Sequence, residues 1–328
     1  IDIPSTPESL VKLSLLLAED DVNQQAVAAL VEADMALAAA VMKAVNSSLY
    51  GLKGRVQSVQ QAITYLGTRE VAGITFEMGL RAAFPQADIQ VQPIDFDRTL
   101  PVAGHVSPAA LARLNLPQLL EAPTLYLDGD TMVRRDIGPL FAPDPDQRPI
   151  AAVRDPGILK ALHQKAGHGW LPSRKSVRHL RDLEKISHLV EAADYINSVV
   201  VLFDLPRIRA LGLDTRMGDL RAAVALRQQY QLRFNDQNWL NVVFRGQIHH
   251  LAPEWNTLWG NRLTGRSPFP QSERAAFAPS RDDPAVVHFT GRLRPWEIRH
   301  PIFYPKRRPW LAAYKALQAE AEAALRMA

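Results

Sequence analysis

Two aspartates separated by one glycine end an apolar run in the stretch YLDGDTMVRRDIGPLF, residues 126–141. A carboxylate is costly to bury without a partner, so Asp128 and Asp130 must be solvated, paired or bound to a cation. Strand alternation predicts that both lie on the same side, and Gly129 allows close backbone approach to a ligand. Their oxygens suit Mg²⁺ or Mn²⁺, and such an ion would neutralise a diphosphate. A capping or turn pair is the alternative interpretation.

The elements around this pair predict an α/β sheet. After Pro85, β-branched apolar runs such as TLYLD and YINSVVVLFDL alternate with helical patterns, which favours buried, mostly parallel strands. In open sheets of this kind ligands bind beyond the carboxyl ends of the strands, where the aspartate pair falls. Residues 264–284 are rich in proline, serine and charge, which predicts a long surface loop or a lid.

The whole chain has the composition of a globular protein. Its 328 residues allow one large domain or two, and 38 basic against 34 acidic residues leave a formal charge of +4, too mild an excess to indicate nucleic-acid binding. The absence of cysteine excludes thiolate metal sites. With no signal-peptide pattern or long apolar run, we expect a cytoplasmic protein. The C-terminal segments GRLRPW and PKRRPW are either a solvated basic surface or a contact with phosphates or with an anionic membrane, which would be peripheral binding at the inner membrane face.

The first part of the chain, residues 5–83, has helical periodicity almost throughout. It resembles an HDOD domain, a helical module related to HD-type phosphohydrolases, in IPSTPESLVKLSLLL, LVEADMALAAAVMKAVNSSLYG and VQSVQQAITYLG. Asp34-Met35 stands where that family usually has Asp-Pro, and the similarity ends near residue 80. No histidine precedes His105, so the metal chemistry of an HD hydrolase is excluded. The resemblance implies a packing or protein-interaction module.

The rest of the chain, from about residue 79 to 328, resembles glycosyltransferase family 8, whose members transfer a sugar from a nucleotide diphosphate with retention of configuration. Five ordered segments carry the resemblance: HVSPAALARLNLPQLL, YLDGDTMVRRDIGPLF, YINSVVVLFDL, FNDQNWLNVVFRGQIHHLAPEWN and VVHFTGRLRPW. The implied fold is α/β, a GT-A-like mixed sheet flanked by helices and preceded by an all-helical HDOD-like half-domain. The domains expected are 1–80 and 81–328.

The resemblance also implies a site. It makes Asp128, Asp130 and His288 the protein ligands of a divalent ion, Mn²⁺ or Mg²⁺, and an imidazole ligand favours Mn²⁺. It places the donor sugar at Arg113, Asn197 and Ser198, the diphosphate at Gly291 and Arg294, and the reacting carbon near Asp236 and Gln237. Arg294 stands where the family has lysine, which keeps the charge but changes the geometry at a phosphate.

The implied reaction is glycosyl transfer through an oxocarbenium-like state. A double displacement needs a carboxylate close to the anomeric carbon, for which Asp236 or Gln237 is nearest. Glutamine is a poor nucleophile, so front-face attack guided by the leaving phosphate is an equally open route.

The expected function is metal-dependent transfer of a hexose from a UDP-sugar to a saccharide or lipopolysaccharide-type acceptor, with a protein partner for the HDOD-like helices. The family's first strand–helix–strand unit, which binds uridine and ribose, has no recognisable counterpart. A natural or engineered fusion, a degenerate enzyme, or a sequence that joins segments separated in the real chain would explain this. The alternative function is a non-catalytic interaction protein that carries a remnant transferase fold.

Overall fold

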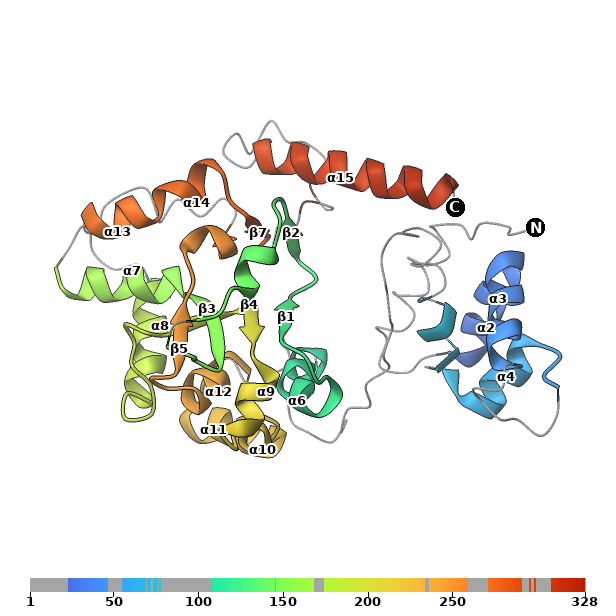
Figure 1. Ribbon diagram of the computed structural model, residues 1–328, viewed down its shortest axis with the longest axis horizontal. Helices are drawn as coiled ribbons and strands as arrows, with labels where there is room; N and C mark the ends of the chain where they lie inside the picture. Colours follow the sequence, from blue (N-terminus) through green and yellow to red (C-terminus); the bar gives the residue numbers. More distant parts are fainter. Residues whose placement is uncertain are drawn as a thin grey trace. The chain divides into compact units, whose positions relative to one another are not determined.

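The computed structural model divides into two compact units, Ile1–Asp95 with Ala312–Ala328 and Phe96–Leu311. Figure 1 labels the elements of both. The structure describes residues 23–46, 55–68, 70–71, 73–75, 77, 108–144, 146–167, 174–233, 236–258, 271–290, 295, 298 and 308–327. The strand expected in ADIQVQPIDF lies outside these residues.

The first unit is helical over its described residues. Helices α2 (Gln24–Ala33), α3 (Met35–Val45) and α4 (Val59–Leu66) bury their apolar faces in one core. Asn23 caps the start of α2 and Ser58 caps the start of α4: their side-chain oxygens accept two and one of the backbone N–H groups, respectively, that have no partner within the helix. No single described helix is both long and apolar enough to cross a membrane. Within the part of the chain that the structure describes, one bent pair, α2 together with residues 37–45 across a bend of 112°, reaches that length and composition.

The second unit contains a four-stranded sheet in the order β1-β4-β3-β5. Its strands are β1 (Thr124–Leu127), β3 (Ile150–Arg154), β4 (Ile196–Phe203) and β5 (Ile248–His250). The expectation of mostly parallel strands is wrong for the described pairs, because β4 runs antiparallel to both β1 and β3 and only β3 and β5 are parallel. Strand β4 is buried along almost its whole length because it is central in the sheet. A buried apolar run of this kind also occurs in parallel sheets, so burial alone does not reveal the direction of the strand.

A smaller three-stranded sheet lies beside the first one. Strand β7 (Val286–His288) pairs antiparallel with β2 (Thr131–Val133) and parallel with β6 (Thr257–Leu258). The register sets Thr131 opposite His288, and the backbone N–H of Phe289 donates to the carbonyl of Asp130 at 2.8 Å. The pairing therefore brings the second half of the aspartate motif to the end of β7.

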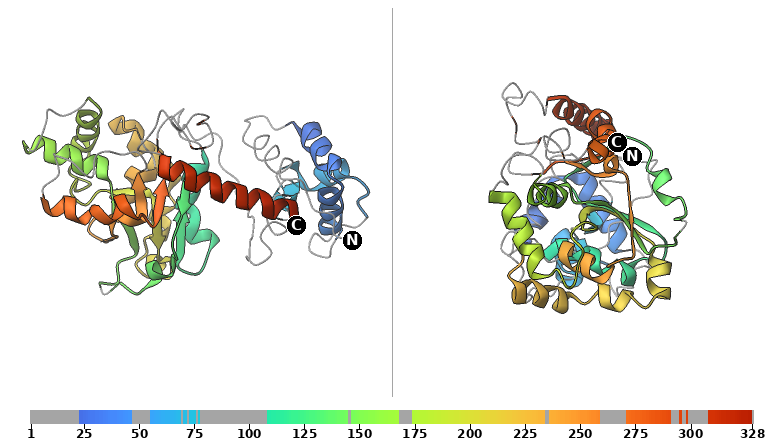
Figure 2. Two further views of the ribbon diagram at one scale, coloured as in Figure 1. Left: turned by 90° about the horizontal axis from the view of Figure 1, so that it is seen from above. Right: turned by 90° about the vertical axis from the view of Figure 1, so that its left-hand side faces the viewer.

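Helices flank the strands of this unit, which confirms the predicted mixed sheet with helical layers (Figures 1 and 2). Helix α12 packs on β4, and α7 packs on α8. The helices are η1 (Pro108–Asn115), α6 (Leu116–Leu119), η2 (Gly138–Phe141), α7 (Pro156–Lys165), α8 (Arg174–Lys185), α9 (Leu205–Ala210), α10 (Asp214–Met217), α11 (Leu220–Tyr230), α12 (Asp236–Val243), η3 (Pro253–Asn256), α13 (Gln271–Ala276) and α14 (Ala278–Asp282). Helix α15 (Arg308–Met327) is divided between the two units.

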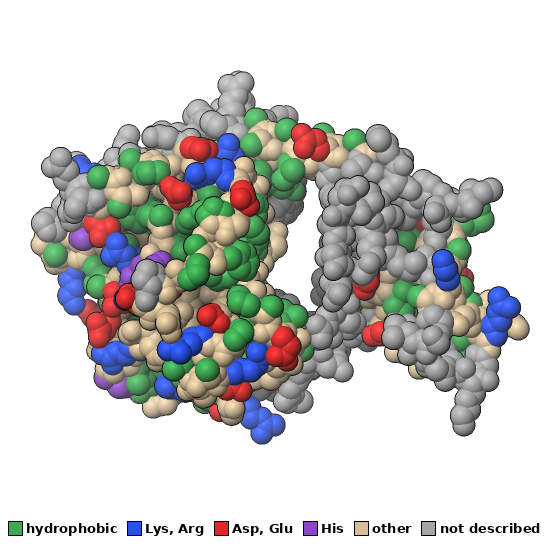
Figure 3. Space-filling view, viewed as in Figure 1, with side chains coloured by type: hydrophobic (Ala, Val, Ile, Leu, Met, Phe, Trp, Pro, Cys, Tyr) green, Lys and Arg blue, Asp and Glu red, His purple; other side chains and the backbone are tan. Residues whose placement is uncertain are grey.

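The region predicted as a long surface loop, residues 264–284, contains α13 and α14 in its described part. Phe277, between the two helices, is buried and packs against Leu159 of α7. The hydroxyl of Ser280 donates to the Phe277 carbonyl at 2.7 Å. Part of a stretch whose composition suggested a loop is therefore helical, and Phe277 packs it against α7. On the face of this unit seen in Figure 3, acidic and basic side chains are interspersed.

Candidate active site

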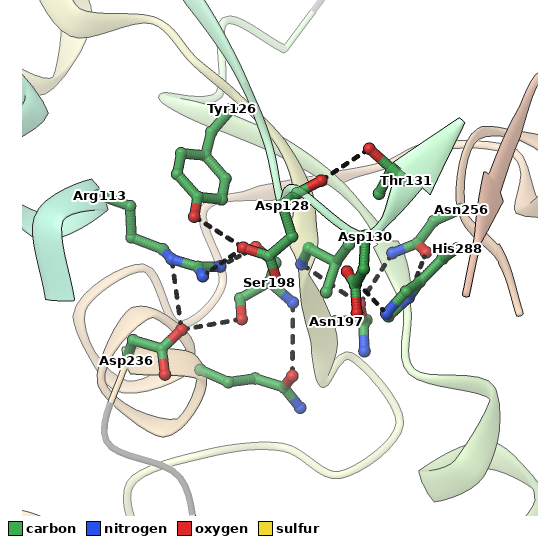
Figure 4. Close-up of polar contacts among 12 residues, drawn as sticks. Arg113, Tyr126, Asp128, Asp130, Thr131, Asn197, Ser198, Asp236, Asn256 and His288 are labelled. Carbon is green, nitrogen blue, oxygen red and sulfur yellow. Dashed lines mark hydrogen bonds and ion pairs between the residues drawn. The ribbon is translucent and has the colours of Figure 1, made fainter. Parts of the chain in front are cut away.

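The aspartate motif lies in the turn that joins β1 to β2, which corrects the expectation that strand alternation places both side chains on one side. Strand β1 ends at Leu127, and the Asp128 carbonyl accepts from the backbone N–H of Thr131 at 3.2 Å and from its hydroxyl at 2.8 Å. Because the chain turns here, the two carboxylates part: Asp128 points toward Arg113 and Asp130 toward His288 (Figure 4).

Arg113, from η1, joins two of the predicted carboxylates. Its side chain is 3% exposed, and its Nη2 lies 2.7 Å from Asp128 Oδ1 while its Nε lies 3.4 Å from Asp236 Oδ2. Its Nη1 also donates to the carbonyl of Ser198. The guanidinium carbon lies 4.2 Å from the centre of the Tyr126 ring. One buried cation thus links β1, β4 and α12 and balances two carboxylates.

Tyr126 completes the surroundings of Asp128, and sequence reasoning did not single it out. Its hydroxyl donates to Asp128 Oδ1 at 2.7 Å. Burial raises the pKa of this phenol above its ordinary value, further than the Arg113 charge lowers it. The hydroxyl therefore stays protonated and acts as a constant donor to the carboxylate.

The start of β4 and the start of α12 carry the predicted sugar-binding groups. Ser198 Oγ donates to Asp236 Oδ2 at 3.2 Å, and the Ser198 backbone N–H donates to Gln237 Oε1 at 3.4 Å. Gln237 Nε2 and Asn197 Nδ2 each donate to Asp155 Oδ2 at 3.3 Å. Buried amide, hydroxyl and carboxylate groups thus face one another at the end of the sheet, a set that can both donate to and accept from sugar hydroxyls.

Asp155 is a site residue that the sequence reasoning missed. It directly follows β3, and its Oδ1 accepts the backbone N–H groups of Gly157 and Ile158, which begins α7. The available signal was the run IAAVRDPG, in which an aspartate follows an apolar strand and precedes a proline at the first turn of a helix. The second oxygen of this capping residue faces the site.

His288 lies at the other end of the network. Its Nε2 is 3.7 Å from Asp130 Oδ1, and its Nδ1 is 3.2 Å from Asn256 Oδ1. Asn256 Nδ2 in turn donates to Asn197 Oδ1 at 2.8 Å. Hydrogen bonds and ion pairs therefore run from Asp128 through Arg113, the sugar-binding groups and Asp155 to His288, which faces Asp130.

The chemistry of the donors partly fits the predicted metal site. Asp130 and His288 present an oxygen and a nitrogen toward each other, whereas Asp128, the third predicted ligand, is engaged by Arg113. Within the described residues, no group of three acidic or histidine side chains converges closely enough to hold a metal ion. Asp130 and His288 thus fit two protein positions of a divalent-cation site.

All predicted site residues that the structure describes belong to this one network. Gly291 and Arg294, predicted for the diphosphate, lie outside the described residues. Three further members come from the structure rather than from the sequence reasoning: Tyr126, Asp155 and Asn256.

Comparisons with known proteins identify two families along the chain. Residues 81–299 match the family model "Glycosyl transferase family 8", and the chain therefore belongs to this family. Residues 3–109 match the HDOD domain model. Because the two matches overlap, the expected boundary between residues 80 and 81 stays a prediction.

Two curated relatives are similar over part of their length. "General stress protein A" of Bacillus subtilis (strain 168) is 24% identical over 205 residues, which cover 61% of this chain and 63% of the relative. "Lipopolysaccharide 1,2-glucosyltransferase" of Escherichia coli (strain K12) is 24% identical over 172 residues, 52% of this chain and 43% of the relative. The chain thus spans less than two thirds of either relative.

Solved glycosyltransferase structures are also similar. The bifunctional enzyme WbbM, in its apo form, aligns with a TM-score of 0.49 and 18% identity over 74% of this chain and 40% of its own. The galactosyltransferase LgtC, in complex with donor and acceptor sugar analogs, aligns with a TM-score of 0.46 and 21% identity over 71% and 72%.

Proposed function

We propose that this chain is a metal-dependent, retaining glycosyltransferase that moves a hexose from a UDP-sugar to a saccharide or lipopolysaccharide-type acceptor. The observation that carries the proposal is the polar network that runs from Asp128 to His288, which faces Asp130, in a chain of glycosyl transferase family 8. The lipopolysaccharide acceptor is supported by the name of the Escherichia coli relative.

Asp130 and His288, together with Asp128, would hold the divalent cation, and the imidazole favours Mn²⁺. When bound, this ion supplies positive charge that stabilises the departing nucleoside diphosphate. Arg113 and Tyr126 keep Asp128 oriented beside that position.

Asn197, Ser198, Asp236 and Gln237 would bind the donor sugar, and Asp155 joins them. Both carboxylates of this set accept from hydrogen-bond donors. Asp236 is held by Arg113 and Ser198. Asp155 is held by the side-chain amides of Gln237 and Asn197 and by backbone N–H groups at the start of α7. A carboxylate held in this way is better suited to orient hydroxyl groups than to attack carbon. We therefore favour front-face attack by the acceptor over double displacement.

The test is calorimetric titration of UDP into the full chain with and without Mn²⁺, followed by transfer assays with a panel of UDP-hexoses. Metal-dependent binding that Asp130→Ala removes supports the proposal. Asp146→Asn is the matched control, because this aspartate is 64% exposed and only pairs with Arg148 at the surface. A folded sample that binds UDP neither with nor without Mn²⁺ would instead support the interaction protein with a remnant transferase fold.

A further inference from the structure

Asp155 fixes the orientation of the first amide in a buried chain of side chains. Both of its oxygens already accept: Oδ1 from the backbone N–H groups of Gly157 and Ile158, and Oδ2 from side-chain amides. The hydrogen bonds at both oxygens come from N–H groups, which can only donate. Asn197, whose amide lies 3.3 Å from Oδ2, must therefore turn its NH₂ group toward Asp155.

Asn197 passes this orientation to the next amide. With Nδ2 turned to Asp155, its Oδ1 accepts from the backbone N–H of Val199 at 3.3 Å and from Asn256 at 2.8 Å. A backbone N–H can only donate, so Val199 requires the same orientation of Asn197 independently. Asn256 must then present its NH₂ group to Asn197 and its oxygen to the opposite side.

The oxygen of Asn256 faces His288 Nδ1 at 3.2 Å (Figure 4). Because an amide oxygen can only accept, Nδ1 must carry the ring hydrogen. A neutral imidazole with hydrogen on Nδ1 has its lone pair on Nε2, the nitrogen that faces Asp130 Oδ1 at 3.7 Å. Asn256 and His288 are both buried, which limits competition by bulk water.

We propose that Asp155, Asn197 and Asn256 are positioning residues that hold His288 as the Nδ1–H tautomer and thereby make Nε2 a metal ligand. In the opposite tautomer, Nε2–H would point its hydrogen at Asp130 and could not bind a cation. The metal-binding consequence rests on the proposed function. The tautomer itself does not, because hydrogen bonds within this chain determine it.

The tautomer can be measured directly in the metal-free full chain. Long-range ¹H–¹⁵N spectra of protein labelled at histidine, recorded near pH 9, well above the ordinary imidazole pKa of about 6.5, distinguish a protonated from an unprotonated ring nitrogen. His288→Gln assigns the signals. We expect the wild-type protein to show hydrogen on Nδ1 of His288, and hydrogen on Nε2 would overturn the proposal without any further variant.

Two substitutions of one residue separate this role from a merely structural one. Asn256→Leu removes the acceptor at Nδ1, so hydrogen should move to Nε2, where Asp130 can accept it. Asn256→Asp keeps an acceptor there and should keep the wild-type tautomer. His249 and His250 on β5 should give unchanged signals in both variants and serve as internal controls. If Asn256→Leu does not fold, Asp155→Asn replaces it, and a partial shift of hydrogen to Nε2 is expected.

Titration of Mn²⁺, followed by electron paramagnetic resonance, tests the consequence for metal binding. We expect Asn256→Leu to weaken Mn²⁺ affinity about 10–100-fold and Asn256→Asp to retain most of it. An unchanged tautomer in Asn256→Leu would overturn the proposal that Asn256 controls the tautomer of His288. If the tautomer changes in Asn256→Leu but neither variant nor wild-type protein binds Mn²⁺, the control of the tautomer is confirmed and the proposed metal dependence is rejected. The two failures are therefore distinguishable.

Discussion

Arg113 is a central residue of this site, because its buried guanidinium forms ion pairs with both Asp128 and Asp236. It also donates a hydrogen bond to the backbone carbonyl of Ser198. Removing a cation from a buried pair leaves uncompensated charge, which costs more than the pair contributes. The cluster therefore depends on the guanidinium both for stability and for geometry.

We predict that Arg113→Met lowers the free energy of unfolding by about 3 kcal/mol at neutral pH, because two carboxylates lose their buried partner. Chemical denaturation measures this. Arg245→Met is the matched control, since Arg245 is 43% exposed and pairs only with Glu191 and a carbonyl at the surface, and it should cost less than about 0.5 kcal/mol. Equal costs for the two variants would show that water or other groups satisfy the carboxylates when Arg113 is absent.

His250, on β5, gives a pH-dependent prediction. Burial lowers its pKa from the ordinary value, which a hydrogen bond to the Asp194 carbonyl only partly offsets. A histidine whose pKa is lowered by folding contributes stability that is present above the unfolded pKa of about 6.5 and is lost as pH falls through the folded pKa. As pH falls from 7.5 to 5, the melting temperature of the His250→Gln variant should therefore decrease less than that of the wild-type protein. A parallel decline in both melting curves would assign the acid sensitivity to other groups.

At the scale of elements, the turn between β1 and β2 has the largest effect on the geometry of the site. It changes sheets between Leu127 and Thr131, and that change separates the two aspartates. Gly129 at its centre is exposed, and a Cβ added there would meet no atom within 4 Å. The described residues therefore leave room for a side chain at this position, and the proposed diphosphate site gives a reason to test it.

We predict that Gly129→Ala leaves the free energy of unfolding unchanged or raises it by up to about 1 kcal/mol, while it weakens UDP binding about tenfold or more. The added methyl group meets open space in the free protein but would occupy the position of a bound diphosphate. Gly212→Ala is the control with the opposite pattern: its φ of +66° strains any side chain, so it should destabilise by about 1 kcal/mol and leave UDP binding unchanged. Unchanged UDP affinity in Gly129→Ala would place the diphosphate away from this turn.

The same elements show what the sequence could and could not predict. Strands β1 and β4 follow directly from TLYLD and YINSVVVLFDL, because β-branched apolar runs between helical patterns indicate buried strands. Strand direction did not follow, since a central strand is buried on both faces in either direction. The orientation of Asp128 and Asp130 depends on where the strand ends, and the contact of Asp155 with Asn197 joins residues 42 positions apart. Such long-range contacts leave no local periodicity in the sequence.

At the scale of the whole molecule, the described apolar residues form separate cores in the two units. One core gathers α2, α3 and α4, whereas the main core of the α/β unit is built from residues between Leu111 and Ile248. Every described residue of the candidate site belongs to the second unit. The HDOD match indicates that the helical unit is a recognisable module in its own right.

We predict that the two cores can be destabilised independently. Val41 in α3 and Val201 in β4 are both fully buried, and replacing either by alanine should cost about 2 kcal/mol through lost burial and the cavity left behind. In scanning calorimetry, Val41→Ala should lower only the transition of the helical unit and leave UDP binding unchanged, whereas Val201→Ala should lower only that of the α/β unit. If both substitutions lower one shared transition by the same amount, the units fold as a single cooperative structure, and the HDOD-like helices would then contribute to the stability of the transferase site.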